Sequence, residues 1–139
     1  MASRLLAVAL LPVLLGASGC AYLTGGLGPY GKPVTAGQLI GTWTGDCAST
    51  LVLRPDLTLT ATGFPLEFDE HDQISTRTSG AGQWTVPTGD TAHPPERLPV
   101  SIGQHGYEVD LAMGAHGALV LAVTVGDPDE GVGCRYTRR

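Results

Sequence analysis

The side chains that could catalyse a reaction lie scattered along this 139-residue chain without a catalytic spacing. Ser101 and His105 are four positions apart, but Gly103 separates them at an expected turn, and no carboxylate is placed to orient the imidazole. The chain contains no Gly-x-Ser-x-Gly, no Ser-x-x-Lys and no phosphate-binding glycine loop. We therefore expect no catalytic residues and no cofactor.

Metal ligation is the next chemistry to consider. Each of the four histidines falls in an expected loop or turn, and none forms a His-x-His or His-x-x-x-His pair: His71, His93, His105 and His116. Two acidic stretches are stronger candidates, one around His71 and one around Pro128: Glu67, Asp69, Glu70 and Asp72, then Asp127, Asp129 and Glu130. Neither has the glycine-containing twelve-residue calcium pattern, so we predict solvated loops and no metal site.

The first twenty residues differ from the rest of the chain. Arg4 precedes an apolar run over residues 5–15, which is shorter than the roughly 20 residues of a membrane-spanning helix. The segment Ala17-Ser18-Gly19-Cys20 resembles the lipobox of bacterial lipoproteins, with Ala17 where that family usually has Leu. The resemblance implies that residues 1–19 are a cleaved signal peptide. It also implies that Cys20 carries diacylglycerol, with fatty acids such as palmitate, on the extracytoplasmic face of the cell membrane.

Two alternatives to lipidation stay open. Ordinary signal peptidase would release a soluble protein, and the uncharged stretch between Arg4 and Lys32 would otherwise remain as an anchor, although its glycines disfavour a continuous helix. After residue 19, seven basic and thirteen acidic residues leave a net charge of −6. This acidity argues against nucleic acid as a partner. The membrane is the expected partner, through the lipid on Cys20.

Composition divides the exported part into two segments. Residues 20–34 are rich in Gly and Pro and show no periodicity, so they are expected to form a flexible, lipidated tether. Residues 35–139 are expected to form a single β domain.

The lipobox leaves two cysteines in an oxidising compartment, and we predict that Cys47 and Cys134 form a disulfide. Two free thiols or a metal site are the alternatives. Two cysteines without further Cys or His at ligand spacing make a poor zinc site. The bond would join the beginning of the domain to its end.

Apolar residues alternate with polar ones in short segments separated by turn signals, as in half-buried β-strands. The segments cover residues 42–44, 49–54, 57–62, 82–86, 98–102, 107–113, 119–125 and 133–137. Before them, Thr35 and Gln38 have the capping-box spacing of one helical turn. We therefore predict an all-β fold, an antiparallel barrel of about eight short strands, with a two-sheet β-sandwich as the alternative.

Gly41-Thr42-Trp43, after a helical turn and at the start of the first strand, resembles the Gly-x-Trp signature of lipocalins and related calycin barrels. In that family the Trp closes the barrel base, often under an Arg from the last strand, which implies such packing for Trp43 with Arg138 or Arg135. The domain from Gly41 to Asp129 also resembles a group of small actinobacterial lipoproteins. That likeness implies the β fold and the location at the membrane, but it implies no activity.

These observations favour a membrane-tethered, non-enzymatic binding or envelope module. Its partner would be an envelope protein or, if the barrel is hollow as in lipocalins, a small apolar ligand. A hydrolase or metal-dependent enzyme whose residues meet only in three dimensions is the remaining alternative. An interior filled by large side chains would favour recognition on the outer surface, and an apolar cavity would favour a carrier.

Overall fold

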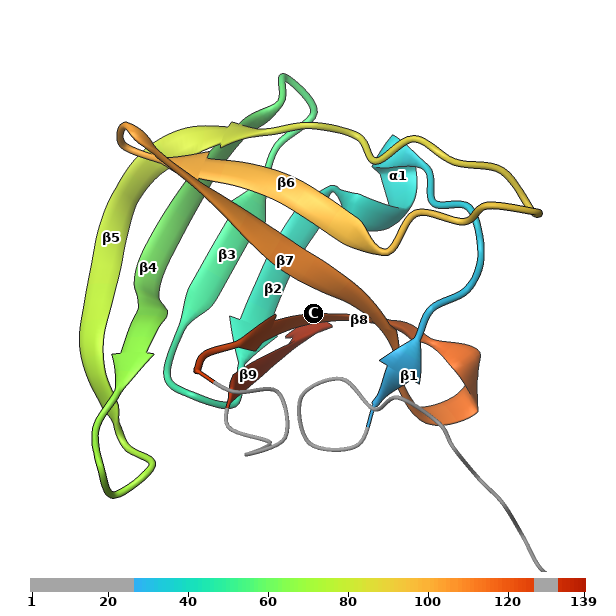
Figure 1. Ribbon diagram of the computed structural model, residues 1–139. Coiled ribbons are helices and arrows are strands. Elements are labelled where there is room, and N and C mark those ends of the chain that lie inside the picture. The colour runs from blue at the N-terminus through green and yellow to red at the C-terminus, as the bar shows by residue number, and fades with distance from the viewer. Residues whose placement is uncertain (1–26, 127–132) are drawn as a thin grey trace, which may run out of the picture.

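The computed structural model describes residues 27–126 and 133–139. They form a closed antiparallel barrel of eight strands with one further short strand outside it (Figure 1). Each barrel strand pairs with the next one in the chain, and the last returns to pair with the first. The predicted barrel is confirmed, and the sandwich alternative is wrong.

The barrel strands alternate in direction around the ring and are joined mainly by short turns. They are β2 (Gly41–Gly45), β3 (Thr50–Leu53), β4 (Thr58–Phe68), β5 (Ile74–Trp84), β6 (Arg97–Ile102), β7 (His105–Met113), β8 (Leu119–Thr124) and β9 (Gly133–Arg138). A 3₁₀ turn, η2 (Ala115–Gly117), links β7 to β8, at the connection predicted there. The β4–β5 hairpin is longer than expected, since both strands have 11 residues, and register shifts interrupt their pairing after Ala61 and around Glu67. Glu67 therefore belongs to a strand, not to a loop.

Side chains from the strands fill the barrel interior. Trp43, Trp84 and Tyr136 have at most 2% of their surface exposed, and they belong to one apolar cluster that also contains Leu111 and Leu121. The indole nitrogens of the two tryptophans donate hydrogen bonds to backbone carbonyls. Burying one large apolar side chain contributes roughly 1.5–3 kcal/mol, so this cluster is the main source of stability.

Part of the predicted tether packs against the barrel. Gly28–Pro29 form strand β1, which pairs with Met113 and Ala112 of β7. Tyr30 and Val34 are buried in the main core. The prediction of a flexible tether as far as residue 34 is therefore wrong for residues 28–34, because these two side chains bury apolar surface between the glycines and prolines. Cys20 and the rest of the leader lie outside the described residues.

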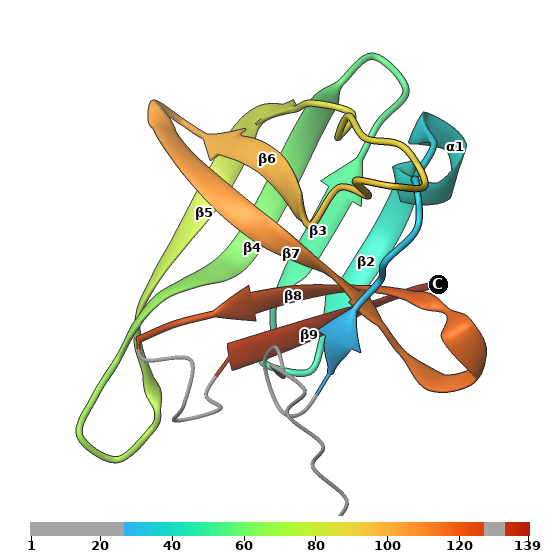
Figure 2. The same cartoon turned by 45° about the vertical axis from the view of Figure 1, so that its right-hand side comes forward.

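The predicted helical turn is confirmed as α1 (Ala36–Leu39). The Thr35 hydroxyl accepts the backbone N–H of Gln38, and the Gln38 side chain accepts the N–H of Thr35, which completes the capping box. Leu39 is fully buried and fixes this turn over one end of the barrel (Figure 2).

A disulfide joins Cys47, in the turn after β2, to Cys134 in β9, and their Cα atoms are 5.3 Å apart. The predicted pair is therefore present in the structure. Gly45 makes room for it: a Cβ atom there would lie 2.6 Å from the Cys134 sulfur and 3.0 Å from the Tyr136 ring. Only glycine fits where the chain enters the turn.

A buried polar chain lies beside the disulfide. The Tyr136 hydroxyl is 2.7 Å from Ser49 Oγ, and Ser49 donates to the carbonyl of Thr62 at 3.0 Å. Because the Ser49 hydroxyl hydrogen is bonded to the Thr62 carbonyl, Ser49 accepts the hydrogen bond from the Tyr136 hydroxyl. Burial raises the pKa of Tyr136 to about 12.

Alkaline stability tests this arrangement. Tyr136 has an ordinary pKa of 10.0 when unfolded, so the unfolded chain loses this proton first as the pH rises. The stability from this shift is complete below pH 10 and falls by up to about 3 kcal/mol between pH 10 and 12. Tyr136→Phe should remove this loss while costing about 1 kcal/mol at pH 7. Urea unfolding from pH 7 to 12 measures both, with Tyr107→Phe as the control. An unchanged alkaline slope in Tyr136→Phe would contradict the assignment.

Candidate functional site

The end of the barrel under α1 is closed by Trp43 and Arg138. These residues face each other across β2 and β9. Trp43 is buried and its Nε1 donates to the Leu39 carbonyl at 2.8 Å. The guanidinium of Arg138 donates to the carbonyls of Gly37 and Gln38 at 3.3 and 3.2 Å. Both residues therefore hold α1 against this end of the barrel through hydrogen bonds to its backbone carbonyls.

Glycine at position 41 permits this packing. Gly41 has φ +142°, which L side chains rarely adopt, and a Cβ atom there would lie 3.1 Å from Arg138 Nε. Arg135, the other arginine considered, pairs with Ala122 on the opposite face of β9. Arg138 is thus the arginine that contacts the helical turn.

The opposite end of the barrel has a hollow at its mouth. A cavity of about 300 Å³ lies between the end of β4 and the residues after β8, and its lining is Leu66, Glu67, Phe68, Asp69, Val125 and Gly126. Leu66 and Phe68 are half-buried against the core, whereas Glu67 and Asp69 are exposed. The mouth therefore combines an apolar floor with an acidic rim. We take it as the candidate small-molecule site.

The acidic stretch around His71 does not form a cation site in the part of the chain that the structure describes. Asp69 Oδ1 accepts the backbone N–H groups of His71 and Gln73, and Glu67 Oε2 accepts the Thr76 hydroxyl. These carboxylates hold the β4–β5 hairpin together. The second acidic stretch, Asp127, Asp129 and Glu130, lies outside the described residues.

Among the described residues, the one cluster of three potential metal ligands is Asp46, Cys47 and Cys134. Both sulfurs are in the disulfide, and zinc needs thiolates. The Asp46 carboxylate instead accepts the backbone N–H of Arg135 at 2.9 Å. The disulfide and this hydrogen bond join the turn after β2 to strand β9.

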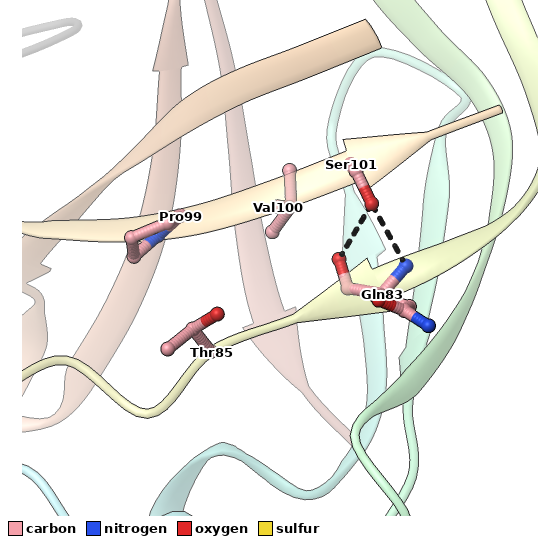
Figure 3. Close-up of a pocket in the computed structure, with 5 residues that line it drawn as sticks. All are labelled: Gln83, Thr85, Pro99, Val100 and Ser101. Atoms are coloured by element: carbon pink, nitrogen blue, oxygen red, sulfur yellow. Dashed lines mark hydrogen bonds between the residues drawn. The ribbon is translucent and has the colours of Figure 1, made fainter. Parts of the chain in front are cut away.

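A second hollow, of about 200 Å³, lies on the outer wall between β5 and β6, and Figure 3 shows its lining: Gln83, Thr85, Pro99, Val100 and Ser101. Ser101 Oγ accepts the backbone N–H of Gln83 at 3.2 Å and donates to its carbonyl at 3.5 Å. The hydroxyl is thus held against the backbone of β5. His105 begins strand β7 and is not in a turn as expected. In the β6–β7 register His105 pairs with Ile102, so it lies on the opposite face of the sheet from Ser101.

Sequence patterns missed the mouth cavity. Leu66 and Phe68 follow Gly63 and Pro65, which interrupt the alternation, and a bulge in β4 decides which side chains point inward. Phe64, Leu66 and Phe68, at alternate positions, were the available signal. Val125 follows β8 and lines the same cavity as Leu66 and Phe68. These segments are distant in sequence, and only the closure of the barrel brings them together.

No protein-family model, curated protein or solved structure matches this chain. In the described part of the chain, no helix is long and apolar enough to span a bilayer. Function is therefore inferred from the chain's own residues.

Proposed function

We propose that this protein is a lipid-anchored module on the extracytoplasmic face of the cell membrane, attached through Cys20, and that it binds an envelope partner without catalysis. The partner would contact the outside of the barrel. The observation that carries this proposal is the filled interior, where Trp43, Trp84 and Tyr136 occupy the space that a carrier would leave for its ligand.

The disulfide and the net charge of the chain support this proposed location. Disulfides persist in oxidising compartments, and the Cys47–Cys134 bond suits an exported domain. A net charge of −5 for the whole chain gives no electrostatic attraction to an anionic bilayer or to nucleic acid. A diacyl group on Cys20 would supply durable attachment, since one acyl chain alone binds only marginally.

A second candidate function rests on the mouth cavity. Its volume of about 300 Å³ is at the lower end for small-ligand sites, and Leu66, Phe68 and Val125 supply apolar surface. A ligand there would have an apolar body held in the mouth and a polar or cationic group near Glu67 and Asp69. It would occupy the mouth and not the barrel centre.

Cys20→Ala tests the address. The lipid reaches the protein only through this thiol, so the variant should lose the diacylglyceryl mass and move from the membrane fraction to the soluble fraction or the medium. Intact mass spectrometry of both fractions measures this, with Ser18→Ala as the control that keeps Cys20. Unchanged fractionation and mass in Cys20→Ala would refute lipidation.

Phe68→Asp tests carriage in the mouth. A charge on the apolar floor should weaken binding of a fluorescent long-chain alcohol, whose neutral polar group suits the acidic rim, at least tenfold, a difference of about 1.4 kcal/mol. Leu57→Asp is the matched control, because Leu57 is 42% exposed and lies in the β3–β4 turn. Circular dichroism verifies that both variants fold. If the unaltered protein shows no saturable binding, or if both substitutions weaken binding equally, ligand carriage in the mouth cavity is excluded.

A further inference from the structure

Among the described residues, part of barrel strand β5 has an edge without a neighbouring strand. β5 pairs with β4 from Ile74 to Gln83, but it pairs with β6 only from Gly82 to Trp84. Residues 74–81 of β5 therefore present an edge to which no other described strand is paired; we call this the free edge. Figure 1 shows β4 and β5 running together below the turn between β6 and β7.

Backbone direction identifies the groups on the free edge. The Ala81 carbonyl accepts the N–H of Gly103 at 3.0 Å, and the Gln83 N–H donates to Ser101 Oγ, so odd-numbered residues of β5 direct their polar groups toward the β6 side. Alternation along the strand then directs the N–H and C=O of Arg77 and Ser79 the same way, whereas the register shift between Glu67 and Phe68 interrupts the alternation at Ser75. Arg77 and Ser79 are both exposed. They form a template of four backbone groups.

The free edge lacks two common kinds of protection. Proteins shield sheet edges with proline, lysine, β-bulges or a covering segment, and a barrel normally removes its edges by closing. Residues 74–81 contain neither proline nor lysine, although register shifts interrupt the β4–β5 pairing. Arg77, the one charged side chain there, donates to the carbonyl of Gly63 in β4 at 2.8 Å and so turns away from the edge.

Charge indicates what would pair with this edge. The adjoining hairpin carries four exposed carboxylates against that one arginine: Glu67, Asp69, Glu70 and Asp72. A second copy would bring the same excess of carboxylates, which does not complement the charge beside this edge. An added strand with basic side chains would complement it.

We propose that the free edge of β5 binds an extended, basic segment of another polypeptide by adding it to the barrel as a further strand. This inference rests on the proposed function of partner binding on the outside of the barrel, and it names the surface and the partner's chemistry. Main-chain hydrogen bonds to Arg77 and Ser79 would give affinity, and the carboxylates would favour basic side chains.

The test uses the mature full chain in detergent and a ten-residue peptide of alternating Thr and Lys. Amide exchange should slow at Arg77 and Ser79 when the peptide is added, and a peptide of alternating Thr and Glu should bind at least tenfold more weakly. Protection confined to other residues, or equal binding of both peptides, would overturn the proposal.

Ser79→Pro and Ser79→Ala form a matched pair for the same titration. Both lose the hydroxyl that accepts the Gly63 N–H, but only proline removes the outward N–H. The proline variant should bind the Thr-Lys peptide at least fivefold more weakly than the alanine variant, with equal thermal melting. Equal binding would count against strand addition. Dimerisation without peptide that protects the same amides would assign the edge to a second copy and overturn the basic partner.

These outcomes are independent of the lipid anchor. If the protein binds the peptide but is not lipidated, only the proposed membrane location is refuted. If the protein is lipidated but does not bind the peptide, only the proposed strand addition at the free edge is refuted.

Discussion

The structure depends on closure of the barrel at the seam between β2 and β9. Three residue pairs join these strands, from Trp43 with Arg138 to Gly45 with Tyr136. Beyond them Asp46 donates its N–H to the Arg135 carbonyl, and the Cys47–Cys134 disulfide follows. Strands so distant in sequence meet only after the chain has paid a large loop-closure entropy. The disulfide offsets much of that cost by restricting the unfolded chain.

Closure determines where function can lie. Because β9 completes the ring, the inward side chains of all eight barrel strands meet in one core, and Trp43, Trp84 and Tyr136 fill it. The interior is thereby committed to stability. What remains for recognition is the rim and the outer wall, especially the β4–β5 hairpin, where the mouth cavity and the free edge of β5 lie within a few residues of each other.

Much of this fold could be predicted from local patterns. Alternation in residues 107–113 and the Thr35 and Gln38 spacing each encode their structure within a few residues, and the all-β architecture follows from repeated alternation. The lower half of the β4–β5 hairpin could not be predicted, because residues 74–80 are mostly Thr, Ser and Gly with no apolar face. Burial of Tyr30 was missed because its neighbours are glycine and proline. The mouth cavity depends on strand register, which short-range patterns do not specify.

The most direct test of closure compares the unfolding free energy in urea of the oxidised protein and of the protein with its disulfide reduced. The bond joins residues 87 positions apart, and the chain-entropy model assigns such a loop about 4.6 kcal/mol. We predict that reduction lowers the unfolding free energy by roughly this amount, with the largest gain in amide exchange along β9. Equal unfolding midpoints for the oxidised and reduced protein would contradict the claim that this seam holds the barrel closed.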